Sequence, residues 1–78
     1  MSSIAEHAVV VLTRDLPEHH LRSGDVGAVV HVYDGGKAYE VEFVSGVGQT
    51  LAVETLGPTD IRSLGAGDIL HTRSVSAA

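Results

Sequence analysis

Residues 24–44 constrain the fold of this 78-residue chain more than any other stretch, because they contain two runs of β-forming residues joined by a turn signal. In the second run, Tyr39, Val41 and Phe43 alternate with small or acidic residues, the pattern of a strand with one buried face. The intervening Asp34-Gly35-Gly36 tolerates the positive φ angles of a hairpin turn. The stretch therefore predicts a β-hairpin whose second strand directs the side chains of Tyr39, Val41 and Phe43 toward a core.

Three further segments have the length and composition of strands. Residues 8–12 and 69–71 are short apolar runs. Residues 49–55 alternate again, with Leu51 and Val53 on one face and polar or small residues on the other. Together with the hairpin, these segments predict five strands joined mostly by short turns, which is typical of an antiparallel sheet.

Two connections shape the rest of the prediction. The long loop of residues 13–23 contains Leu16 and Leu21, which are expected to fold it back over one end of the core. Thr59 or Asp60 is expected to start a single helical turn. The sequence therefore predicts an all-β fold, a small SH3-like barrel with a long early loop and one helical turn before the last strand. The alternative is an open, curved antiparallel sheet that a second copy of the chain completes.

The length indicates one domain covering residues 1–78, with an ordered core of about 7–72 and flexible ends, residues 72–78 forming a frayed tail. Gly27 lies inside a strand pattern, where glycine marks a bulge, a bend or the close approach of another backbone, and a strand shared by both sheets of a small barrel is expected to bend there. A chain of this size buries only about 60% of its unfolded surface. With three aromatic residues and no cysteine, such a core is often supplemented by self-association, so a homodimer is one expectation.

Charge and hydropathy restrict the partners. Ten acidic against five basic residues give a formal charge of −5, which opposes binding to a phosphate backbone. The chain lacks the basic and then apolar organisation of a signal peptide, and no apolar run approaches the roughly 20 residues that span a bilayer. A cytoplasmic protein without a nucleic-acid or membrane partner is therefore expected. Because small barrels often carry RNA, a nucleic-acid-binding barrel is the alternative function.

Histidines and acids of the early loop form the densest set of potential metal ligands, namely Asp15, Glu18 and the pair His19-His20. Structural zinc sites usually have four convergent ligands, and catalytic ones three with an open position. This loop has no such spacing, so a solvated polar loop is favoured and neither a metal nor a cofactor is predicted.

A histidine and a carboxylate could also meet across the sheet, since His31 and His71 lie in expected strands and Glu40 or Glu42 in a neighbouring one. Such a pair can act in general acid–base catalysis when it lines a pocket, but cross-strand pairs are mostly surface complements. No serine or threonine stands in a nucleophile-elbow context. The chain is therefore predicted not to be an enzyme, and no catalytic residue is assigned.

Partner binding is the favoured role, because Tyr33 and Tyr39 flank the hairpin turn and His31, Glu40 and Glu42 lie on the same two strands. These five residues are the predicted partner-binding set. The sequence predicts a non-catalytic protein-interaction or accessory module that can also bind a second copy of itself. A more distant alternative is an immunity or antitoxin protein acting on a neighbour in an operon.

Much of the chain, about residues 8–62, resembles the bacterial family called domain of unknown function 4926. The likeness rests on Asp15-Leu16-Pro17-Glu18-His19, Leu21, Gly24-Asp25-Val26-Gly27, Val29-Val30-His31-Val32-Tyr33, Ala38-Tyr39-Glu40-Val41-Glu42-Phe43-Val44 and Gln49-Thr50, the Tyr-Glu-Val-Glu-Phe block being the most specific. The resemblance implies a small, standalone, cytoplasmic barrel-like protein with no assigned activity. Members often carry glycine where this chain has His20. A looser likeness to the SH3-like domain of nitrile hydratase β subunits suggests an accessory module by analogy.

Overall fold

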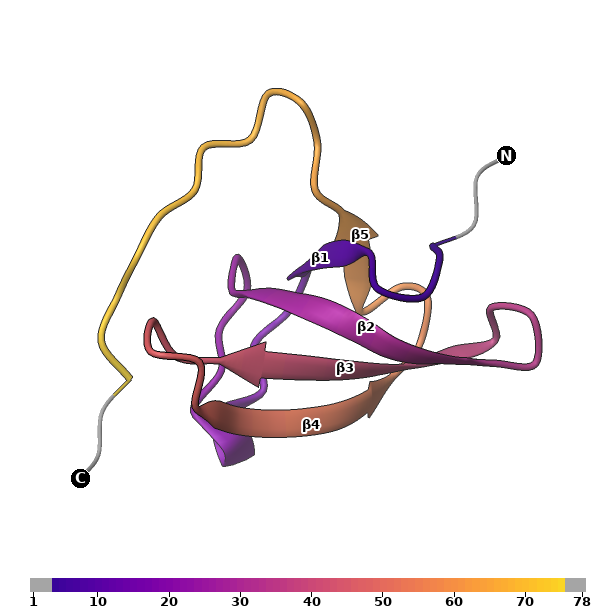
Figure 1. The fold of residues 1–78 in the computed structure, drawn as a ribbon, viewed down its shortest axis with the longest axis horizontal. Coiled ribbons are helices and arrows are strands. Elements are labelled where there is room, and N and C mark those ends of the chain that lie inside the picture. The colour runs from indigo at the N-terminus through magenta and orange to yellow at the C-terminus, as the bar shows by residue number, and fades with distance from the viewer. Residues whose placement is uncertain (1–3, 76–78) are drawn as a thin grey trace.

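The computed structural model describes residues 4–75 and contains five antiparallel strands in one curved sheet (Figure 1). The order across the sheet is β4-β3-β2-β1-β5. The elements are β1 Val9–Leu12, the short 3-10 helix η1 Pro17–His19, β2 Val26–Tyr33, β3 Ala38–Val44, β4 Thr50–Leu56 and β5 Ile61–Ser63. The predicted all-β fold of five antiparallel strands is confirmed. Residues 4–75 contain no helix long and apolar enough to cross a membrane.

The core lies on the inner face of this sheet. In β3 the predicted alternation is confirmed, since Tyr39, Val41 and Phe43 are at most 3% exposed. Leu16 and Leu21 are also buried, and their backbones pair across η1, so the early loop does fold over the core as predicted. The buried cluster consists of Val10, Leu12, Leu16, Leu21, Val29, Tyr39, Val41, Phe43, Leu56 and Ile61.

Gly27 in β2 allows the hairpin strands to pack closely. A Cβ atom at this position would lie 2.8 Å from both Phe43 Cε1 and Val41 Cγ1, and 3.0 Å from the Glu42 carbonyl oxygen. Side chains essentially never tolerate such contacts, so only glycine fits without a shift. The expected close approach is confirmed.

Two sequence predictions about the chain after β4 are wrong. The helical turn is not found before the last strand, because residues 57–60 form one tight turn in which the Asp60 carboxylate accepts a 2.9 Å hydrogen bond from the Gly57 N–H. The only 3-10 helix within residues 4–75 is η1, in the early loop. The last strand is β5, which pairs with β1, and residues 69–71 form no strand.

Residues 64–75, here called the arm, leave β5 and arch away from the sheet before returning toward the turn between β3 and β4 (Figure 1). A turn at residues 65–68 sends the chain away from β1, which explains why the apolar run that follows joins no strand. Arg73, within the tail that is expected to fray, bonds to the early loop. The last three residues of that tail, 76–78, lie outside the described residues, as do residues 1–3.

Candidate protein-binding surface

The solvent-facing side of β2, β3 and β4, here called the outer face, carries four of the five predicted partner-binding residues. The strand register places His31 of β2 opposite Glu40 of β3, and Thr55 of β4 opposite Glu40 from the other side. Because alternate residues of a strand share a face, Tyr33 and Glu42 lie on this side too. Four of the residues therefore come together on one surface.

Tyr39 is the exception, and its assignment to a partner-binding set is wrong. Its side chain is 3% exposed and belongs to the core cluster. The physical reason is the strand period: Tyr39 lies one residue from Glu40, so its side chain points to the opposite face of β3. A partner cannot reach its ring without unfolding this part of the sheet.

Hydroxyl groups fix the carboxylates of the outer face. Glu40 accepts hydrogen bonds from the Thr55 hydroxyl at 2.6 Å and the Tyr33 hydroxyl at 3.3 Å. Glu42 accepts one from the Thr50 hydroxyl at 2.6 Å. Lost hydration and the nearby Glu40 carboxylate raise the pKa of Tyr33, so its phenol stays a donor. These bonds hold two negative charges at defined positions on neighbouring strands.

His31 stacks edge-on against Tyr33, with ring centroids 4.5 Å apart, and extends this polar cluster along β2. A carboxylate oxygen of Glu6 lies 3.6 Å from the Nδ1 atom of His31, and both side chains are about half exposed. His71 lies on the arm, where it lines a groove with Phe43 and Val44 at the far end of β3, and it belongs to no strand. His31 and Glu40 are thus cross-strand neighbours in the register, but the carboxylate that lies within 4 Å of the His31 ring is that of Glu6 in the N-terminal segment.

Aliphatic side chains lie beside these carboxylates. Val44, Leu51 and Val53 are 49%, 43% and 44% exposed. Leu51 and Val53 were predicted to share one face of their strand, and that face is the exposed one, because Leu56 supplies the buried side chain of β4. The outer face thus combines exposed apolar surface with hydrogen-bonded negative charge.

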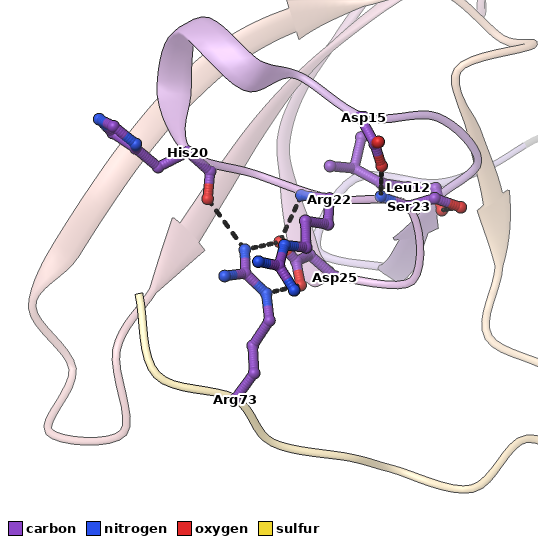
Figure 2. A network of polar contacts seen from close by, with 7 residues as sticks. All are labelled: Leu12, Asp15, His20, Arg22, Ser23, Asp25 and Arg73. Carbon is purple, nitrogen blue, oxygen red and sulfur yellow. Dashed lines mark hydrogen bonds and ion pairs between the residues drawn. The ribbon is translucent and has the colours of Figure 1, made fainter. Parts of the chain in front are cut away.

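The potential metal ligands of the early loop diverge. His19 lies 3.1 Å from a carboxylate oxygen of Glu54 in β4, and Asp15 accepts a 2.8 Å hydrogen bond from the Ser23 N–H. His20 ends η1 in the left-handed conformation, with φ of 59°, and its ring points away from the loop (Figure 2). These side chains serve the loop and its contact with β4.

A second polar feature, here called the clasp, ties the arm to the loop before β2 (Figure 2). Asp25 accepts hydrogen bonds from Arg73 Nε at 2.9 Å, from Arg73 Nη2 at 2.5 Å and from the Arg22 N–H at 2.8 Å. Arg73 Nη2 also donates to the His20 carbonyl oxygen at 2.9 Å. The Arg73 and Asp25 side chains are only 24% and 19% exposed, so this ion pair is the least exposed of those that residues 4–75 contain.

Burial and bonding act in opposite directions on Asp25. Its partial burial raises the pKa of the carboxyl group, whereas the hydrogen bonds from Arg73 and the Arg22 N–H lower it. The net effect lowers the pKa below the ordinary aspartate value of 3.8. The carboxylate is therefore charged in the pH range where arginine is also charged. Nothing in the local sequence links these two residues, which are 48 positions apart.

A groove of about 570 Å³ lies beside the clasp. The strands and early loop provide a largely apolar wall, and residues 71–75 of the arm provide the other side. The wall residues are Leu21, Asp25, Val26, Phe43, Val44, Ser45, Gly46 and Leu51. Val44 and Leu51 border both the groove and the outer face, so the two features meet at the end of β3.

The family comparison separates the strands from the arm. The model of the family described as domain of unknown function (DUF4926) matches residues 6–63, most of the chain. This chain belongs to that family. The DUF4926 match includes all five strands and ends at the last residue of β5, so the arm begins directly after it. No curated protein and no solved structure matches the chain, so the SH3-like label stays a prediction.

Proposed function

We propose that this DUF4926 chain is a non-catalytic protein-binding module that contacts its partner through the outer face. The observation that carries the proposal is the exposure of Val44, Leu51 and Val53 beside two fixed carboxylates. Apolar side chains grouped on a sheet face and bordered by polar groups are typical of protein interaction sites. A cytoplasmic setting and an SH3-like barrel belong to the same proposal and come from the resemblance to the family.

The chemistry of the face favours one kind of partner. The Glu40 and Glu42 carboxylates lie on β3, and Val53 lies beside them, opposite Glu42 on β4. A complementary protein surface would present apolar side chains flanked by lysine or arginine. The formal charge of −5 adds long-range attraction for such a basic surface and speeds encounter.

The hydrogen bonds on the outer face reduce the cost of binding. Free glutamate side chains lose rotamer freedom when a partner orders them, which opposes association. Here the Thr55 and Thr50 hydroxyls already hold Glu40 and Glu42 at 2.6 Å before any partner arrives. The two carboxylates are therefore already oriented for charge-assisted hydrogen bonds with lysine or arginine side chains of a partner.

The test uses affinity capture followed by direct binding. The full chain is immobilised, proteins captured from native cells are identified by mass spectrometry, and the purified partner is titrated by calorimetry against wild type, Val53→Ser and Glu42→Lys. We expect each variant to weaken binding about tenfold or more, the size of an interface hot spot. Val47→Ser, in the turn between β3 and β4, and Glu18→Lys, in η1, are the matched controls and should bind like wild type.

Two results would overturn the proposal. One is recovery of nucleic acid without a protein, which would favour the nucleic-acid-binding alternative. The other is a purified partner whose affinity is unchanged by Val53→Ser and Glu42→Lys, which would place binding on another surface.

A further inference from the structure

Two ion pairs attach the arm to the rest of the molecule, in addition to a 3.4 Å backbone bond from its first residue, Leu64, to Val9 of β1. At its base, Arg62 of β5 forms a two-pronged ion pair with Asp68, at 2.8 and 3.2 Å, and Asp68 also accepts a 2.6 Å bond from the Gly65 N–H. At its far end, Arg73 forms the clasp with Asp25. The first attachment lies within the arm and the adjoining strand, so the clasp is what brings the far end back to the sheet.

Between these points the arm is exposed. Ile69 and Leu70 are 89% and 69% exposed, and both are large apolar residues. Within the described part of the chain, residues 69–75 make no backbone hydrogen bond to a neighbouring segment. An extended segment with free backbone groups and two exposed aliphatic side chains is suited to contact another chain.

The groove has the chemistry to hold such a segment. Its wall combines the Asp25 carboxylate with apolar side chains, and the arm that lies against it provides Arg73 followed by Ser74 and Val75. The clasp is a charge-assisted pair with two bonds from one guanidinium, which gives orientation as well as affinity. Any second copy of the chain carries the same arm and the same groove.

The arm is also long enough to reach a neighbour. Residues 64–72 connect β5 to the clasp, and nine extended residues span up to about 30 Å. The two shorter dimensions of the molecule are 26 and 22 Å. A straightened arm can therefore carry Arg73 past its own groove to that of an adjacent copy.

We propose that two copies of this chain exchange arms, each placing Arg73 against the Asp25 of the other. Exchange preserves every contact of the clasp, as in domain swapping, and a two-fold axis makes the arrangement closed. The two arms then cross near the axis, which brings Ile69 and Leu70 of both copies together and removes their exposed surface from water. This dimer uses the groove and the arm and shares Val44 and Leu51 with the outer face, whereas Val53 belongs to the outer face alone, so Val53→Ser distinguishes the two proposals.

A charge-swap mixture tests the exchange. The Asp25→Arg chain has arginine at both positions 25 and 73, and the Arg73→Asp chain has aspartate at both positions. Neither chain can therefore form a clasp with its own arm. In an equal mixture, each arm matches the groove of the other chain, so both clasps can form only between chains. We expect sedimentation velocity to show a doubling of the mass from 8.1 kDa in the mixture and not in either variant alone. The double variant carrying both substitutions is the control, because it should behave as wild type.

A mixture that stays at 8.1 kDa, while both variants keep the wild-type circular dichroism spectrum, would overturn the proposal. If Asp25→Arg does not fold, sedimentation velocity of the wild-type chain over a series of concentrations tests the proposal instead. A wild-type dimer whose dissociation constant rises about tenfold in Arg73→Ala and in Leu70→Ser, and is unchanged in Val53→Ser, supports the exchange. The proposal is overturned if the wild-type chain stays monomeric at every concentration, or if Arg73→Ala leaves the dissociation constant of the dimer unchanged.

Discussion

The five-stranded body and the arm are held in place by different kinds of interaction. In the body, every strand is hydrogen-bonded to a neighbour, and ten buried apolar side chains form one cluster. Apart from a 3.4 Å bond from the Leu64 N–H to the Val9 carbonyl oxygen of β1, residues 64–75 make no backbone hydrogen bond to a strand, and carboxylate–guanidinium pairs hold the arm at its two ends. The burial of apolar side chains involves no titrating group, whereas ion pairs near the surface are weakened by salt and lost when the carboxylate is protonated. The comparison indicates that the body can persist under conditions that release the arm.

The largest effect should come from the body. Phe43→Ala removes a buried ring from a core with few aromatic side chains and is expected to cost about 3–5 kcal/mol, enough to unfold a small domain. Urea unfolding followed by circular dichroism measures this loss. Val47→Ala, in the exposed turn after β3, should leave the midpoint unchanged. A midpoint that barely moves in Phe43→Ala would contradict the assigned inner face of β3.

Gly27→Ala tests the close packing of the hairpin. The added methyl group would meet Phe43 and Val41 at 2.8 Å, and overpacking of this kind costs about 1–3 kcal/mol. Gly46→Ala is the matched control, because a Cβ there has no neighbour within 4 Å. The same urea experiment should show a lower midpoint for Gly27→Ala alone, and equal midpoints would show that β2 and β3 are further apart.

Acid should separate the arm from the body. The pKa of Asp25 is lowered in the folded chain, so the stabilisation that the clasp provides is present above the ordinary value of 3.8 and is lost as the pH falls through the folded value. Below about pH 4 we expect the amide signals of the arm to shift toward those of an unstructured chain before the strand signals change. Arm and strand signals that change together in an NMR titration would argue against separate units.

Arg73→Ala should have a small effect on the body and a local effect on the arm. An ion pair of partly exposed groups contributes up to about 1 kcal/mol, so the urea midpoint should move little. Heteronuclear NOE values at residues 73–75 should fall because the clasp is the attachment at that end. Arg14→Ala, which removes a pair with Asp60 outside the arm, is the control and should leave those values unchanged.

The sequence predicted the body better than the arm because the body depends on local patterns. The alternation of Tyr39, Val41 and Phe43 identified β3 and its buried face, and Leu16 and Leu21 identified the cover of the core. The same alternation should have excluded Tyr39 from the partner-binding set. The short β5 was missed, because three residues with one buried side chain give almost no periodic signal.

The clasp and groove could not be predicted, for a different reason. Asp25 looks like a turn residue and Arg73 like part of a polar tail, and only the path of the arm brings them together across 48 positions. The groove likewise joins residues from the early loop, from β2 to β4 and from the arm. The outer face could be predicted in part, since its polar residues lie on adjacent strands of one hairpin. The alternation also puts Leu51 and Val53 on one face of their strand, but it does not say whether that face is buried or exposed.

One predicted effect is a small gain in stability at His20, where body and arm meet. His20 has φ of 59°, a left-handed conformation that costs an L-residue free energy and that glycine adopts readily. His20→Gly should therefore stabilise the body by about 0.5–1 kcal/mol in urea unfolding. The backbone carbonyl that accepts the Arg73 bond remains, so the NOE values of the arm should stay at their wild-type level. His19→Gly, inside η1, should instead lower stability, and a loss in both variants would mean that the His20 ring contributes more than its backbone strain costs.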